Sequence, residues 1–194
     1  MSWGKFIATA GLFGAYIVKD TIPDEKIEIL RDNCNNLRDR AMIDFLLSTG
    51  IRVGELVRLN IDDIDFSERE CVVYGKGDKE RKAYFDAKTK IHLLNYIESR
   101  TDNNIALFVS LNKPHSRLTE SGVELRLRER GKKLGVEKVH PHKFRRTMTT
   151  RAIEKGMPIE QVQKILGHEQ IDTTLRYAMV NQNNVKLSHR KYIS

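Results

Sequence analysis

Residues 49–56 read T-G-I-R-V-G-E-L, a stretch that places an arginine directly after the end of a helix. Gly50 suits the left-handed backbone with which many helices end, so the preceding helix should stop at Thr49-Gly50. A short helix should then run from Val53 to Leu59. Glu55 lies one turn beyond Arg52 and can fix its guanidinium from behind. The alternative is an ordinary ion pair on a helix surface.

The segments on either side of this break are also helical in pattern. Pro23 stands at the favoured first position of a helix that turns Ile27 and Leu30 inward. In the next helix, apolar residues at fourth-residue spacing predict one buried stripe, which consists of Leu37, Ala41, Met42, Phe45 and Leu46. Helical patterns return from Ala87 onward (Ile91, Leu94, Ile97) and at 118–134, 141–155, 158–166 and 173–179.

The segment from Asn60 to Phe85 has a different character. Cys71–Tyr74 and Arg81–Phe85 are β-prone, and the glycine-rich turn Gly75–Asp78 between them predicts a hairpin with Lys76 at its tip. The fold class that follows is α+β, mainly α-helical, with one small antiparallel sheet.

The net charge of +8 points to a partner of opposite sign, most often nucleic acid. Residues 114–151 hold eleven Lys or Arg against four Glu, so this stretch carries +7 of the total. Its densest part predicts a phosphate-binding face formed by Arg126, Arg128, Arg130, Lys132 and Lys133. The alternative is a solvated helix in which Glu124 and Glu129 pair with the arginines.

Cys34 and Cys71 have no C-x-x-C spacing, which indicates free thiols in a reducing cytoplasm. The apolar run Phe6–Val18 is too short to span a bilayer and precedes no cleavage signal, so no membrane partner is expected. We interpret residues 1–21 as a linker, the stub of a preceding domain or a remnant of cloning. His140-x-His142 suggests a metal, but no Cys or carboxylate follows at ligand spacing.

Six reactive side chains stand next to helix ends or turns that can present them: Arg52, Lys76, His142, Arg145, His168 and Tyr177. Arginine forks bind phosphate oxygens and offset charge in a transition state. Lysine and histidine transfer protons, and a phenol can form a covalent phosphoester. Taken singly, each residue also has a purely structural explanation. As a set they predict phosphodiester cleavage that needs no metal or other cofactor.

Four segments together resemble the successive signature boxes of the tyrosine recombinase/phage integrase family. They are TGIRVGEL at 49–56, GKGDKER at 75–81, HPHKFRRT at 140–147 and LGH with a tyrosine nine residues later at 166–177. The resemblance extends from Ile22 to Val180. It implies the family's catalytic fold, with a three-stranded antiparallel sheet and a catalytic domain at 22–180.

The resemblance also implies roles for residues. Arg52 and Arg145 would clamp the phosphate, Lys76 would be the general acid, and Tyr177 the nucleophile. His142 would transfer protons, His168 would position the phosphate, and Glu55 would orient Arg52. The expected DNA contacts are Lys79 (also a weaker rival to Lys76), Arg81, Lys143 and Arg146, where Arg146 replaces the histidine usual in the family.

The function implied is site-specific recombination of double-stranded DNA through a 3′-phosphotyrosyl intermediate, as a tetramer when full length. This chain alone is expected to be a monomer, because it has no room for the family's N-terminal DNA-gripping domain. Residues 181–194 are expected to be a tail that docks on a neighbouring protomer or is disordered. The alternatives are relaxation of DNA like a type IB topoisomerase, a non-catalytic DNA-binding derivative, and a helix-turn-helix repressor.

Overall fold

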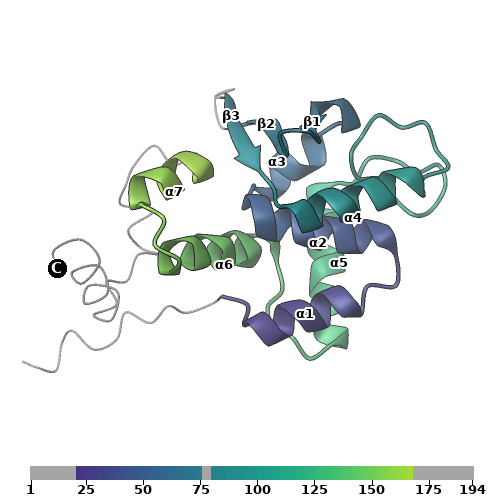
Figure 1. Cartoon of the computed structure of the whole chain (residues 1–194). Helices are drawn as coiled ribbons and strands as arrows, with labels where there is room; N and C mark the ends of the chain where they lie inside the picture. The colour runs from purple at the N-terminus through teal and green to yellow at the C-terminus, as the bar shows by residue number, and fades with distance from the viewer. Residues whose placement is uncertain (1–20, 76–79, 168–194) are drawn as a thin grey trace, which may run out of the picture. The chain divides into compact units, whose positions relative to one another are not determined.

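The computed structural model describes residues 21–75 and 80–167 (Figure 1). The predicted helix at 173–179 therefore lies outside the described residues. The described helices are α1 (Asp24–Asp32), α2 (Leu37–Thr49), α3 (Val53–Arg58), α4 (Ala87–Glu98), α5 (Glu120–Lys133), α6 (Pro141–Glu154) and α7 (Ile159–Leu166), with a 3₁₀ turn at Ile61–Asp63. The strands are β1 (Ile64–Asp65), β2 (Glu70–Tyr74) and β3 (Glu80–Tyr84).

The strands form one antiparallel sheet in the order β1-β2-β3. Cys71 pairs with Ala83 across β2 and β3, and both side chains are buried together with Val73. Tyr74 and Tyr84 are about half exposed, as period-two alternation requires of a sheet with one covered face. The mainly helical fold with a three-stranded antiparallel sheet is confirmed. β1 has only two residues, too few for alternation to reveal it.

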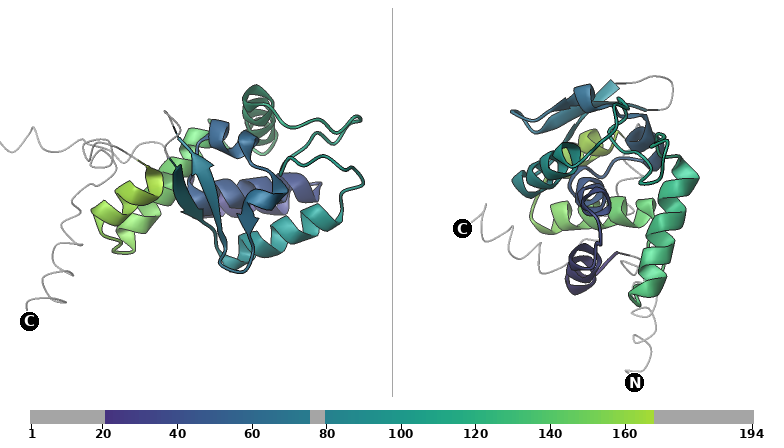
Figure 2. Two further views of the ribbon diagram at one scale, coloured as in Figure 1. Left: turned by 90° about the horizontal axis from the view of Figure 1, so that it is seen from above. Right: turned by 90° about the vertical axis from the view of Figure 1, so that its right-hand side faces the viewer.

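Helix α2 lies at the centre of the domain, between α4 and α6 (Figure 2). Phe45 of α2 meets Phe85 after β3 and Phe108, with ring centroids at 5.8 and 6.2 Å. The expectation of a single buried stripe was wrong for α2. Leu37, at its first residue, is 44% exposed, whereas Asp44 on another face is buried. A helix with neighbours on several sides has no single apolar face.

The apolar face expected for α4 was wrong at Ile91, although Ile97 packs against the core. Ile91 is 56% exposed, and the buried residues are instead Thr89, Leu93 and Tyr96. Tyr96 stacks on Phe108 with a centroid distance of 5.6 Å, and its hydroxyl accepts a hydrogen bond from the Val109 amide. The aromatic contact and the satisfied hydroxyl together favour burying this side of the helix.

The cysteines are free thiols, as predicted. Burial raises the pKa of Cys34 to about 11 and that of Cys71 to about 12. Both thiols therefore stay protonated at neutral pH and act as small apolar groups. Within the described ranges, no helix has the length and apolar character needed to cross a bilayer.

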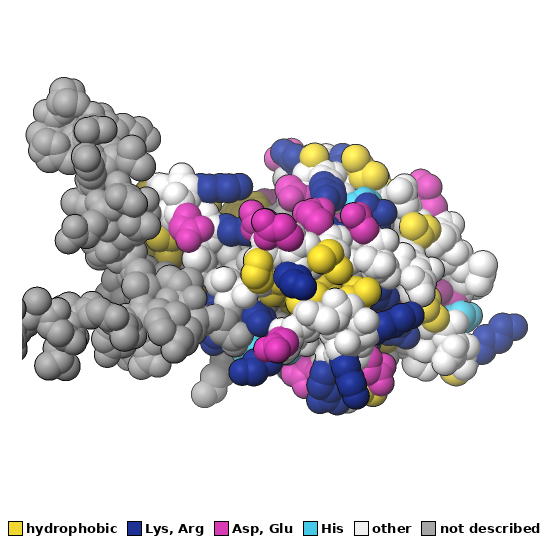
Figure 3. Space-filling view, turned by 90° about the horizontal axis from the view of Figure 1, so that it is seen from below, with side chains coloured by type: hydrophobic (Ala, Val, Ile, Leu, Met, Phe, Trp, Pro, Cys, Tyr) yellow, Lys and Arg dark blue, Asp and Glu magenta, His cyan; other side chains and the backbone are white. Residues whose placement is uncertain are grey.

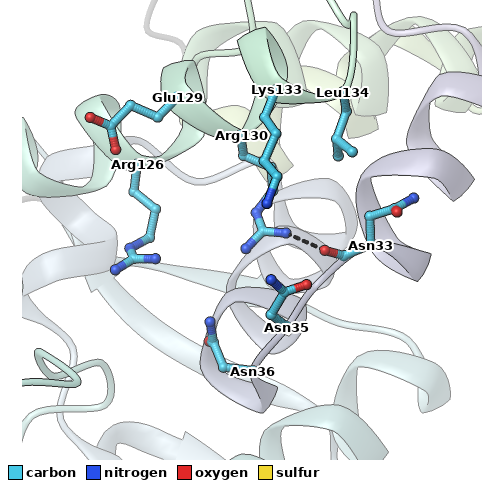
Figure 4. A pocket seen from close by; sticks show the side chains of 8 residues that line it. All are labelled: Asn33, Asn35, Asn36, Arg126, Glu129, Arg130, Lys133 and Leu134. Atoms are coloured by element: carbon cyan, nitrogen blue, oxygen red, sulfur yellow. Dashed lines mark hydrogen bonds between the residues drawn. The ribbon is translucent and has the colours of Figure 1, made fainter.

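A buried carboxylate joins α2 to the basic helix α5. Asp39 is fully buried and binds Arg38 at 2.7 Å, Arg126 at 3.0 Å and Arg130 at 2.8 Å. Arg130 also donates to the Asn33 carbonyl, at the edge of a polar pocket that Arg126, Lys133 and three asparagines line (Figure 4). Two of the five expected phosphate-binding cations are thus paired with a buried carboxylate, although the Arg126 side chain is still 41% exposed.

The remaining three cations of α5, Arg128, Lys132 and Lys133, are exposed, and their contact with phosphate stays a prediction. The pairing of Glu124 and Glu129 with these arginines, which belonged to the alternative of a solvated helix, was wrong. In the part of the chain that the structure describes, no ion pair joins Glu124 or Glu129 to an arginine of α5. One face of the molecule shows acidic and basic side chains intermixed, not a surface of a single sign (Figure 3).

We expect Asp39→Ala to lower the free energy of unfolding by about 3–5 kcal/mol, because it leaves Arg38 buried without its carboxylate. Urea denaturation of the chain measures this. Glu129→Ala, an exposed change on α5, is the control and should stay within about 0.5 kcal/mol of the parent. Equal losses of unfolding free energy from the two substitutions would contradict the role of Asp39 as the buried partner of Arg38.

The same carboxylate predicts a pH dependence of stability. Burial alone would raise the pKa of Asp39, but the charge and hydrogen bonds of Arg38, with Asn36 and Arg126, hold it below its ordinary value. A carboxyl with a lowered folded-state pKa stabilises the fold above its unfolded pKa of about 3.9. That stabilisation is lost as the pH falls through the folded-state value. Asp39→Ala should flatten this part of the unfolding profile, and an unchanged profile would refute the claim.

Candidate active site

The break between α2 and α3 places Arg52 as the sequence predicts. Gly50 has a φ of 61° and ends α2 in the left-handed conformation. The chain then turns so that Arg52 precedes α3, and Glu55 accepts hydrogen bonds from the Arg52 amide at 2.8 Å and from its guanidinium at 3.0 Å. The Glu55 side chain is 4% exposed and that of Arg52 39% exposed. Glu55 therefore holds the Arg52 guanidinium on one side, and the exposed part of that guanidinium can contact a ligand.

Glu55 holds a second arginine, which comes from the sheet. Arg81 of β3 donates from Nη2 to Glu55 Oε2 at 2.6 Å and from Nη1 to the Ile165 carbonyl of α7 at 2.8 Å. Its side chain is only 11% exposed. Burial lowers the pKa of Arg81, and the charge of Glu55 acts in the opposite direction. The expected DNA contact of Arg81 stays a prediction. In the structure both terminal nitrogens of Arg81 already make internal hydrogen bonds.

Arg145 of α6 connects the ends of two other helices. Its Nη1 donates to the Gly50 carbonyl and its Nη2 to the Leu166 carbonyl, each at 2.6 Å. The residue is 6% exposed. Arg145 thus binds the backbone next to both other arginines. Gly50 lies two residues before Arg52, and Leu166 follows Ile165, whose carbonyl accepts from Arg81. Both expected phosphate-clamping arginines are in this cluster, although Arg145 is the more deeply buried of the two.

His142 lies one helical turn before Arg145, and its side chain is exposed. Its ring meets that of His140 edge-on, with a centroid distance of 6.4 Å. The exposure fits a group that transfers protons to a ligand, a role that stays a prediction. Among residues 21–75 and 80–167, no group of three or more His, Cys, Asp or Glu is placed to hold a metal ion.

The expected DNA contacts on α6 differ in their surroundings. Lys143 is buried, and its ammonium donates to the Glu137 carbonyl at 3.0 Å. Arg146 is partly exposed. Contact of either residue with DNA stays a prediction.

Four of the predicted site residues lie outside the described residues: Lys76, Lys79, His168 and Tyr177. Two of them directly follow a described segment: Lys76 comes after Gly75, the residue that follows β2, and His168 comes after Gly167, which ends α7. The roles of these four residues stay predictions.

The role of Arg81 in joining Glu55 to α7 was missed by the sequence analysis. One signal was available. Alternation along β3 puts Arg81 on the same side as the buried Ala83, so its side chain points into the domain, not toward solvent. A charged residue on the covered face of a strand needs an internal partner, and Glu55 was the acidic residue already assigned to the site.

Comparisons with known proteins identify the family of the chain. The model of the phage integrase family matches residues 21–184. The tyrosine recombinase XerC of Staphylococcus aureus is 36% identical over 173 residues, covering 84% of this chain and 57% of that protein.

Two solved structures extend the comparison. The crystal structure of XerA recombinase has a TM-score of 0.76 and 32% identity, covering 90% of this chain and 65% of that one. The structure of XerH recombinase bound to its difH substrate shares the fold, with a TM-score of 0.73 at 22% identity and 91% and 55% coverage. The chain spans little more than half the length of the curated relatives it matches. By sequence match and by fold, the chain belongs to the phage integrase family of tyrosine recombinases.

Proposed function

We propose that residues 22–180 form the catalytic domain of a site-specific DNA recombinase, with Tyr177 as its nucleophile. The observation that carries the proposal is the pairing of Arg52 with the buried Glu55 beside Arg145. A guanidinium held rigidly from one side presents its remaining donors to a phosphate in a defined direction. Family membership supports the same chemistry, because the matched relatives are tyrosine recombinases.

In the proposed reaction the Tyr177 oxygen attacks the phosphorus of a DNA phosphodiester. The bond from phosphorus to the 5′ oxygen breaks, its electron pair leaves with that oxygen, and Lys76 supplies the proton. His142 accepts the proton of the Tyr177 hydroxyl, and His168 places the phosphate. The 5′ hydroxyl of a partner strand then attacks the phosphorus of the 3′-phosphotyrosyl ester. The bond from phosphorus to the Tyr177 oxygen breaks, and His142 returns the proton to the released tyrosine. Each step exchanges one phosphoester for another, so no ATP is consumed.

Arg52 and Arg145 stabilise the negative charge that develops on the non-bridging phosphate oxygens. Arg52 is the one with a substantially exposed side chain, so it is the stronger candidate for direct contact with the phosphate. Arg145 is anchored to two carbonyls and adds positive charge at the same place. Prealigned cations of this kind stabilise a transition state without having to reorganise during the reaction.

Duplex DNA is the proposed partner, in line with the XerH structure, which contains that protein's difH substrate. We further propose a cytoplasmic enzyme that recombines DNA as a tetramer in its full-length form, with residues 181–194 docking on a neighbouring protomer. The 194 residues by themselves should be monomeric and bind DNA weakly. Residues 1–21 would be a linker to a DNA-gripping domain in a full-length enzyme.

Tyr177→Phe should abolish covalent capture of DNA, because the phenyl ring has no oxygen to attack phosphorus. The measurement is a gel assay with a nicked suicide duplex, whose sequence the parent chain has first selected from a randomised pool. Tyr84→Phe, at a half-exposed tyrosine on the outer face of the sheet, is the control and should react like the parent. Adduct formation by Tyr177→Phe would refute the assignment, and relaxation of supercoils without strand exchange would indicate a topoisomerase.

Lys76→Ala should slow cleavage of ordinary DNA by about 10²–10⁴-fold, the usual contribution of a general acid. Replacing the 5′ bridging oxygen by sulfur should restore the rate, because a thiolate leaves without being protonated. Arg52→Ala should not be rescued in this way, since its charge acts on the non-bridging oxygens. If Lys79→Ala shows the slow rate and the sulfur rescue in place of Lys76→Ala, the general acid is Lys79.

A further inference from the structure

Arg81 joins the sheet to the end of α7 through contacts that a DNA-binding lysine or arginine would not make. β3 packs against α7, and the buried guanidinium bridges a carboxylate of α3 and a main-chain carbonyl of α7. Its two partners are 26 and 84 residues away in sequence, so the bridge is tertiary and not local.

The end of α7 depends on two arginines. The last carbonyls of a helix have no partner within the helix and carry partial negative charge. Here the Ile165 carbonyl accepts from Arg81 and the Leu166 carbonyl from Arg145. Two guanidiniums therefore hold the last two carbonyls of α7 in place.

Gly167 lets Arg81 approach this closely. It has a φ of 61°, and a Cβ atom built on it would lie 2.5 Å from Arg81 Cδ and 2.7 Å from Nε. No side chain fits between the helix end and the arginine. The backbone of α7 and the stem of Arg81 are thus in direct contact at the residue that ends the helix.

Glu55 makes this anchor part of the phosphate site. Its Oε2 accepts from both Arg81 Nη2 and the Arg52 amide, and its Oε1 accepts from the Arg52 guanidinium. A change in the position of Arg81 must therefore move either Glu55 or the end of α7. Both are coupled to arginines that the proposed mechanism uses.

We propose that Arg81 is a positioning residue for strand exchange: through Glu55 and the Ile165 carbonyl it holds Arg52 and the end of α7 in one geometry. The inference rests on the proposed function and deepens it. Arg81 touches no reacting atom in this scheme. Its effect should appear in the rate of the chemical step and not in the affinity for DNA.

Hydrogen exchange tests the anchor without any DNA. In the 194-residue chain, Arg81→Met should speed amide exchange at Leu166 and Gly167 by about tenfold or more, because α7 loses one of its end contacts. Arg100→Met is the matched control, since Arg100 is equally buried and also bridges a carboxylate, that of Asp102, to backbone carbonyls. It should leave these amides unchanged. Equal exchange in the parent and Arg81→Met would overturn the proposal.

Single-turnover cleavage tests the consequence for chemistry. With the selected nicked duplex, Arg81→Met should form adduct about 100-fold more slowly, the scale expected when a catalytic group shifts by about 1 Å. The dissociation constant, from fluorescence anisotropy, should change less than about threefold, since no DNA contact is removed. Arg81→Lys should fall between the two rates, because one ammonium lacks the fork that reaches both partners. If Arg81→Met slowed cleavage only by destabilising the fold, Arg100→Met should slow it to a similar extent.

A double-mutant cycle tests the route through Glu55. If Arg81 acts through this carboxylate, Glu55→Gln and Arg81→Met together should slow cleavage much less than the product of their separate effects. Independent, multiplicative effects would overturn that route.

Gly167→Ala disturbs the same contact from the side of α7. The new methyl group would push Arg81 aside, so cleavage should slow by more than in Gly135→Ala. Gly135 has a similar φ of 64° but nothing within 4 Å, so its substitution reports backbone strain alone. Equal rates in the two variants would count against the proposal.

The outcomes separate the two levels of inference. A parent chain that forms no adduct overturns the proposed function, and hydrogen exchange still decides whether Arg81 holds α7. A reactive parent with an equally reactive Arg81→Met overturns the positioning role alone. Weakened DNA binding at an unchanged chemical rate would make Arg81 a DNA contact instead.

Discussion

The carboxylate of Glu55 is the constraint on which the candidate site depends. It is almost fully buried, and an isolated carboxylate there would be costly to keep ionised. The guanidiniums of Arg52 and Arg81 balance its charge. Because both arginines bind the same group, the position of the exposed one is tied to the position of the buried one. The geometry of a surface cation is thereby set by an interaction inside the fold.

The local parts of this arrangement were predictable from sequence and the distant parts were not. Gly50, Arg52 and Glu55 lie within six residues, so the rules for helix ends and for pairs one turn apart identify them. The partners of Arg81 are far along the chain, and no periodicity names them. The predictions of which helix face is buried failed for a similar reason. Leu37 and Ile91 fit an amphipathic pattern, but which side of α2 or α4 is covered depends on neighbours that the pattern does not contain.

Not every basic residue that counts toward the net charge lies on the surface, although the buried carboxylates Asp39, Asp44 and Glu55 offset the buried cations. Arg38, Arg81 and Arg145 count toward the total, yet all three lie inside the domain and donate to carboxylates or carbonyls. Arg126 and Arg130 are likewise engaged by Asp39. A composition-based argument for nucleic-acid binding thus holds only for the cations that remain exposed. In this chain the site chemistry gives a stronger argument for DNA than the charge does.

The hydrogen bonds that Arg81 and Arg145 make to Ile165 and Leu166 go to main-chain oxygens. Peptide carbonyls are present whatever residue occupies a position, so the anchor is indifferent to the identity of Ile165 and Leu166 as long as the helix forms. The exposed positions of α7 can therefore accumulate substitutions while the contacts of its end with β3 and α6 keep their geometry. Gly167 is the exception, and it should be the least replaceable residue of that segment.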